Sequence, residues 1–94
     1  MLIRLNNKTV EGDGYRIIVP DIHTVIYEEC ARTARLEIEG GMSARVVDWL
    51  IYSETLSGWH DESGVVPISA TERAIILSRV AESLNLLEMP NRLV

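Results

Sequence analysis

The chain has 94 residues, a formal net charge of −5 and one cysteine, Cys30. A chain of this length corresponds to one domain, so residues 1–94 are expected to form a single domain with a modest core. A lone cysteine leaves no internal disulfide and no apolar run is long enough for a membrane span, so the cytoplasm is the expected location.

Short apolar segments in the first half of the chain predict β-strands. Gly12-Asp13-Gly14 is a strong turn signal, because Gly adopts positive φ at little steric cost, and it precedes a β-branched strand over 16–19. Residues 22–29 form the next apolar run, and 36–39 alternate with charged neighbours as a half-buried strand does. Arg32-Thr33 is the expected turn between them, so these two runs are predicted to form an antiparallel hairpin.

The middle of the chain is less regular. Residues 45–52 are almost continuously apolar, and periodicity does not distinguish a central strand from a buried helix there. The β-branched and aromatic residues of this block favour a strand. Residues 53–59 are expected to form a helical turn or a loop, and 60–64 a polar turn. The tail 91–94 is expected to be a free end or a short edge strand.

The last element has the clearest signal. Ser69 and Glu72 form a capping box, in which each side chain bonds the free backbone N–H of the other residue. A helix follows, and Pro90 ends it. Its apolar side is expected to pack on the sheet and contains Ala74, Ile76, Leu77, Val80, Ala81, Leu84 and Leu87, whereas Ile75 and Leu86 fall on the polar side with Ser78, Arg79, Glu82 and Ser83.

The order of these elements predicts the fold class. Strands fill the first two thirds of the chain and a single helix follows them. We therefore expect an α+β domain, a small antiparallel β-sheet (a meander) with one C-terminal α-helix packed on one of its faces.

An acidic segment gives the only indication of a partner. Residues 46–72 contain no Lys or Arg, and their five acidic residues alone account for the net charge of −5. Both tryptophans lie in this segment, and Trp buries a large area in interfaces while carboxylates attract basic groups. The segment predicts a protein partner with a basic surface and argues against nucleic acid, which requires clustered Lys and Arg. The candidate contact residues are Asp48, Glu54, Trp59, His60, Asp61 and Glu62.

Other interpretations of the same residues stay open. Trp59 would serve equally well as a core residue beneath the helix, and Trp49 is expected to be core. A small hydrolase or metal-binding enzyme could use His60 and the acids beside it, but consecutive side chains converge poorly on an ion. Cys30 is expected to be a buried small apolar residue rather than a nucleophile. No catalytic residue, metal or cofactor is therefore expected. A homodimer with Ile75 and Leu86 in its interface is a further alternative.

Several motifs between residues 27 and 73 follow one another in a characteristic order. Tyr27-Glu28 precedes Leu36-Glu37-Ile38-Glu39, then Leu50-Ile51-Tyr52-Ser53, Trp59 and a capped helix that begins with Ile68-Ser69-Ala70-Thr71-Glu72-Arg73. Over about residues 22–90 this order resembles the small immunity proteins of bacterial polymorphic toxin systems. The resemblance implies a non-enzymatic cytoplasmic protein of a bacterium that neutralises a toxin, often a basic nuclease, by occluding its surface.

Overall fold

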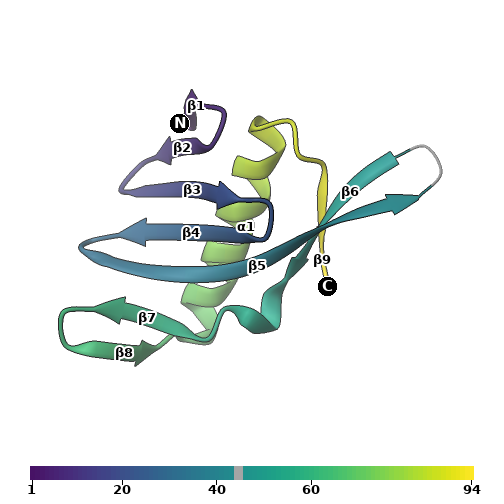
Figure 1. Cartoon of the computed structure of the whole chain (residues 1–94). Coiled ribbons are helices and arrows are strands. Elements are labelled where there is room, and N and C mark those ends of the chain that lie inside the picture. The colour runs from purple at the N-terminus through teal and green to yellow at the C-terminus, as the bar shows by residue number, and fades with distance from the viewer. Residues whose placement is uncertain (44–45) are drawn as a thin grey trace.

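A computed structural model of the chain describes residues 1–43 and 46–94 (Figure 1). One α-helix and nine β-strands account for most of these residues. In chain order the elements are β1 Ile3–Asn6, β2 Thr9–Gly12, β3 Tyr15–Asp21, β4 Thr24–Glu29, β5 Arg32–Ser43, β6 Val46–Tyr52, the 3-10 turn η1 Ser53–Thr55, β7 Gly58–Asp61, β8 Gly64–Pro67, α1 Ala70–Leu86 and β9 Asn91–Leu93.

All the strands belong to one sheet, with the order β1-β2-β3-β4-β5-β6-β9. The long strand β5 organises it, because its first half pairs with β4 and its second half with β6. The edge of β5 opposite β4 also receives β7, through the pair Thr33 and His60, and β8 completes a hairpin with β7. The sheet therefore branches where β5 passes from one neighbour to the next (Figure 1).

The predicted fold class is confirmed in its broad form, since the molecule is an α+β structure with an antiparallel-rich sheet and one C-terminal helix. The expectation of a small meander is wrong. Strands β1 and β2 add to the first edge, β7 arises within segments expected to be loop and turn, β8 follows it, and β9 pairs in parallel with β6. The tail is thus the short edge strand that was one of its two expected forms.

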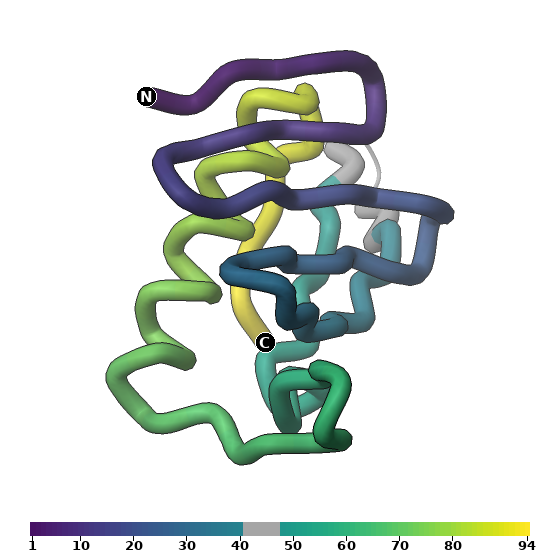
Figure 2. Tube along the Cα trace, turned by 90° about the vertical axis from the view of Figure 1, so that its left-hand side faces the viewer, coloured from purple at the N-terminus to yellow at the C-terminus, as the bar shows by residue number. Residues whose placement is uncertain are grey.

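The helix covers one face of the sheet, and the core lies between the two layers (Figure 2). Strand alternation places the apolar side chains on this inner face. The largest fully buried side chains come from most of the strands and from α1: they include Ile17, Tyr27, Leu36, Ile38, Ile51, Trp59, Ile76 and Leu84. Strand residues of the opposite parity, such as Glu37 and Glu39, point to the outer face and are exposed.

The turn between β4 and β5 lies two residues earlier than expected. Cys30 and Ala31 form it, with positive φ values of 49° and 60°. Two consecutive positive φ values are what the type I′ hairpin turn requires, and its twist matches that of the strands it joins. Cys30 is consequently exposed, and the expectation that it is a buried core residue is wrong.

The helix begins as predicted. The Ser69 Oγ accepts a hydrogen bond from the Glu72 backbone N–H at 3.1 Å, and Glu72 Oε1 accepts one from the Ser69 N–H at 3.1 Å. Ile75 and Leu86 are exposed, as expected. The buried face is rotated slightly from the predicted one, because Ser83 is fully buried and Ala74 is exposed.

The apolar block 45–52 forms strand β6 from Val46 onward, which confirms the favoured interpretation; residue 45 lies outside the described residues. Its burial is less complete than expected. Ile51 is fully buried, whereas Trp49 is only partly buried against the core. Of the two forms expected for 53–59, a helical turn or a loop, the structure has a helical turn over Ser53–Thr55, η1. Arg73 of the helix donates hydrogen bonds to the carbonyl oxygens of Ser53 and Leu56, which tie η1 to the start of α1.

Candidate protein-binding surfaces

Trp59 is not available as an exposed aromatic anchor. Its side chain is 1% exposed and belongs to the core, so the prediction that it contacts a partner is wrong. The alternative interpretation, a tryptophan that fills the core beneath the helix, is confirmed. The physical reason is the alternation along β7: Trp59 points inward, and its neighbour His60 is left on the exposed side.

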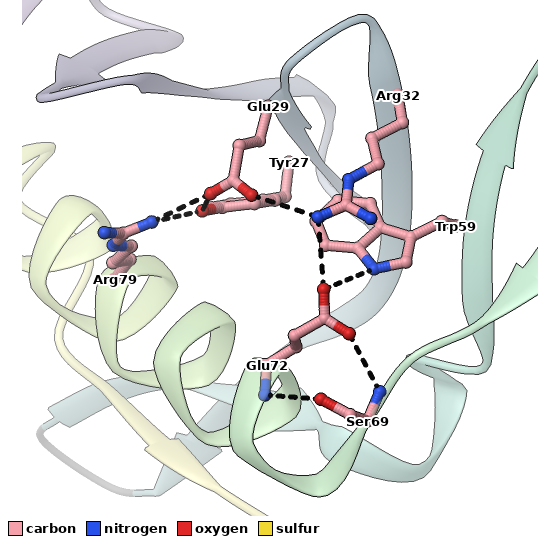
Figure 3. A network of polar contacts seen from close by, with 7 residues as sticks. All are labelled: Tyr27, Glu29, Arg32, Trp59, Ser69, Glu72 and Arg79. Carbon is pink, nitrogen blue, oxygen red and sulfur yellow. Dashed lines mark hydrogen bonds and ion pairs between the residues drawn. The ribbon is translucent and has the colours of Figure 1, made fainter.

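A network of polar side chains surrounds Trp59, which we call the Trp59 network (Figure 3). The indole Nε1 donates to Glu72 Oε2 at 3.2 Å. The Arg32 guanidinium lies over the indole ring, 3.8 Å from its centroid, and donates to the same Glu72 oxygen at 3.1 Å. A cation over an indole face is favourable because the ring carries a negative quadrupole there. The network consists of Tyr27, Glu29, Arg32, Trp59, Ser69, Glu72 and Arg79.

The second half of the network centres on Glu29. Its Oε2 accepts hydrogen bonds from the Tyr27 hydroxyl at 2.7 Å and from Arg79 at 3.0 Å, and its Oε1 accepts one from Arg32 at 3.3 Å. Arg79 also donates to the Tyr27 hydroxyl oxygen at 2.6 Å. The network therefore joins the end of β4, the start of β5, β7 and two turns of the helix.

The pKa shifts follow from these contacts. Partial burial raises the pKa of Tyr27 to about 12, and the hydrogen bond to Glu29 adds to the shift. Partial burial disfavours the Glu29 carboxylate, but hydrogen bonds from Tyr27 and Arg32 and the charge of Arg79 outweigh this, so the pKa of Glu29 falls below its usual value. The backbone hydrogen bond from Ser69 lowers the pKa of Glu72, with help from the Ser69 and Trp59 side chains.

At neutral pH the network contains two carboxylates and two guanidinium groups. Each carboxylate forms an ion pair with at least one of the guanidinium groups, and each guanidinium group with at least one carboxylate. A lowered carboxylate pKa is the reverse of what a general acid near pH 7 needs. The arrangement is suited to fixing the β7–β8 hairpin and the helix start against the sheet. A hollow of about 150 Å³ beside it is lined by network residues together with Ile75 and Ile76.

The predicted residues His60, Asp61 and Glu62 are exposed at the end of the β7–β8 hairpin. Asp61 Oδ1 accepts hydrogen bonds from the backbone N–H and the hydroxyl of Ser63, at 2.7 and 2.6 Å. The bond from the Ser63 side chain is the main reason that the pKa of Asp61 lies below its usual value. Within residues 1–43 and 46–94, no three His, Cys, Asp or Glu side chains gather as metal ligands.

A second group of acids lies on the outer face of the sheet. Glu37, Glu39, Tyr52 and Glu54, which we call the acidic patch, line a shallow hollow of about 390 Å³ together with Thr55. The Tyr52 hydroxyl donates to Glu39 Oε2, and this bond is the main cause of the raised pKa of Tyr52. Across the described part of the chain, none of the three patch carboxylates forms an ion pair.

Sequence reasoning identified Glu54 but not its neighbours in the patch. The alternation of 36–39 places Glu37 and Glu39 on the exposed face, and that much was expected of them. Their proximity to Tyr52 depends on the register of β5 and β6, in which Glu37 lies opposite Tyr52. No local pattern in the sequence indicates that register.

Asp48, the remaining predicted residue, belongs to a different part of the molecule. It lies on β6 opposite Gly41, near the distal end of the β5–β6 ribbon, and is partly buried. This ribbon and the β7–β8 hairpin extend in different directions (Figure 1). The predicted contact residues thus divide into the hairpin end, the acidic patch and the ribbon, and the structure does not bring all of them together.

A comparison of the chain with protein-family models, with curated proteins and with solved structures gave no match. The resemblance to immunity proteins therefore stays a prediction. Among the described residues, no helix is both long enough and apolar enough to cross a membrane.

Proposed function

We propose that this chain is a non-enzymatic, cytoplasmic binding protein of the immunity or antitoxin type, which neutralises a basic toxin domain by covering its surface. The observation that carries the proposal is the acidic patch. Its carboxylates of Glu37, Glu39 and Glu54 line one hollow and have no ion-pair partner among the described residues. Like charges repel when placed together, and a basic partner would relieve that repulsion on binding.

Tyr52 takes the role first assigned to Trp59. It is partly exposed in the middle of the patch, and its hydroxyl is held by Glu39. Tyrosine is enriched in interfaces because it offers a large, rigid contact area with a polar end. A restrained Tyr52 therefore supports a preformed binding surface that loses little side-chain freedom when the partner arrives.

The hairpin end supplies a second contact through His60 and the acids Asp61 and Glu62, and Asp48 supplies a third on the β5–β6 ribbon. In this proposal Trp59 contributes indirectly, because it anchors the hairpin that carries the exposed acids. Surface carboxylates of this kind mainly raise the rate of association with a basic partner, and salt reduces the effect.

The test is a binding measurement against the product of a neighbouring toxin gene. The variant Glu37→Lys/Glu39→Lys should weaken binding by at least about tenfold and flatten its dependence on salt, since charge pairs across an interface couple strongly. The matched control is Glu82→Lys/Glu88→Lys, which makes the same charge change at exposed positions of α1 and its C-terminal end. An equal loss of affinity in both variants would show that net charge, and not the patch, determines binding.

A further inference from the structure

Strand β8 presents an open edge. All four of its residues are exposed, and Val65 and Val66 retain 66% and 40% of their accessible surface. Among the described strands, β8 pairs with β7 alone. An edge strand of this kind offers unpaired backbone N–H and C=O groups, and those groups are able to pair with another extended chain.

The other edges of the sheet are better protected. Strand β1 carries Arg4, and its pairing with β2 is interrupted by a shift of register between Arg4 and Asn6. Strand β9 has only three residues and carries Arg92. Irregular pairing, shortness and a positive charge are the features that discourage edge pairing. Strand β8 has no charged residue, and its one protective residue, Pro67, lies at its end.

The β7–β8 hairpin is held in place before any partner arrives. Trp59 fixes β7 to the helix start through Glu72 and to β5 through Arg32. Gly58 allows β8 to lie close to β7, because a Cβ there would come within 2.8 Å of Val65 Cγ1 and 3.1 Å of the Val66 carbonyl oxygen. A preformed edge loses little conformational entropy when it pairs.

We propose that an extended segment of the basic partner adds to the open edge of β8 as a further strand. Main-chain hydrogen bonds and contacts with Val65 and Val66 hold this segment, and basic residues flanking it lie near Asp61 and Glu62. The occupant is basic because the segment that contains β8, residues 46–72, has five acidic residues and no Lys or Arg to balance them. The net charge of −5 disfavours a second copy of this chain in the same place. This inference rests on the proposed function and specifies how the partner is held.

The experiment uses a short blocked peptide of alternating valine and lysine as the probe, added to the isotopically labelled chain. Amide chemical shifts and hydrogen exchange are measured along the whole backbone. Strand addition predicts shifts and slowed exchange in β8 and at its β7 partners. The control peptide has the same sequence with every backbone nitrogen methylated, which preserves charge and side chains but removes the N–H donors along both of its edges. It should bind at least about tenfold more weakly, because the hydrogen bonds of strand addition come from the backbone.

A variant of the chain provides the second control. Val65→Lys places on β8 the kind of charge that protects natural edges, and it should reduce peptide binding while an unchanged amide and indole N–H resonance of Trp59 shows that the hairpin is intact. Equal binding of the methylated peptide would overturn strand addition. Shifts confined to the acidic patch would also overturn it but leave the proposed function standing. Protection of β8 that grows with protein concentration, without peptide, would assign the edge to a second copy instead.

Discussion

The Trp59 network and the acidic patch use the same residue types in opposite ways. In the network, Glu29 and Glu72 each accept hydrogen bonds from an arginine and from an aromatic side chain. In the patch, Glu39 has a tyrosine partner, and no described basic residue pairs with Glu37, Glu39 or Glu54. A carboxylate that is paired within the fold contributes to stability, whereas one left without a cation is available to another molecule.

This contrast implies that stability and binding are separable in this protein. Changes in the network should alter the free energy of unfolding first, and changes in the patch should alter partner affinity with little effect on the fold.

The largest effect is expected from Trp59→Ala. The side chain is 1% exposed, and large-to-small changes of a buried tryptophan cost about 3–5 kcal/mol. Urea unfolding followed by circular dichroism measures this loss. The matched control is Trp49→Ala, where the ring is only partly buried against the core and the cost should be clearly smaller. Equal losses would mean that the two rings contribute equally to the core, contrary to their burial.

The helix cap is expected to contribute less. Ser69→Ala removes the oxygen that accepts from the Glu72 backbone, and the loss of such a cap costs about 1 kcal/mol. Thermal unfolding of the variant measures the difference. Ser78→Ala, an exposed serine within the same helix, should be neutral or slightly stabilising because Ala favours the helix. A larger loss for Ser78→Ala than for Ser69→Ala would contradict this account, because neither the cap nor helix propensity predicts it.

Acid should weaken the network. The pKa values of Glu29 and Glu72 are lower in the folded chain than the usual 4.5, so the unfolded chain binds protons more readily. Their contribution is therefore complete above about pH 4.5 and is lost as the pH falls through the folded values. Urea unfolding between neutral pH and pH 3 should show this decline. The variant Glu29→Gln/Glu72→Gln should show a shallower decline, and an unchanged slope would assign the acid sensitivity to other carboxylates.

The sequence was sufficient for elements whose signals are local. The capping box at Ser69 and Glu72 and the strand over 46–52 need only neighbouring residues, and the structure contains both. The α+β class follows from their order. The turn at Cys30 was missed because neither Cys30 nor Ala31 is a residue that favours positive φ, so the hairpin geometry overrides local preference there.

The composition of the candidate sites depends on contacts between residues that are distant in the sequence, and no local sequence pattern indicates such contacts. The burial of Trp59 follows from the parity of a strand that was expected to be loop and turn. The patch forms only because the register of β5 and β6 places Tyr52 beside Glu37 and Glu39. Charge composition indicated the acidic segment 46–72, but it did not separate carboxylates that pair with arginine, such as Glu72, from those that form no ion pair among the described residues, such as Glu54.

The smallest effect on stability is expected from neutralising the patch. Glu37→Gln/Glu39→Gln removes like charges that no described cation balances, so the free energy of unfolding should change by less than about 0.5 kcal/mol, with a slight gain favoured. Glu29→Gln makes the same chemical change where three side chains donate to the carboxylate, and it should be destabilising. Parallel urea titrations of both variants decide the matter. If the patch variant loses as much stability as the Glu29 variant, its carboxylates serve the fold, and they are then a poor choice for the surface that binds a partner.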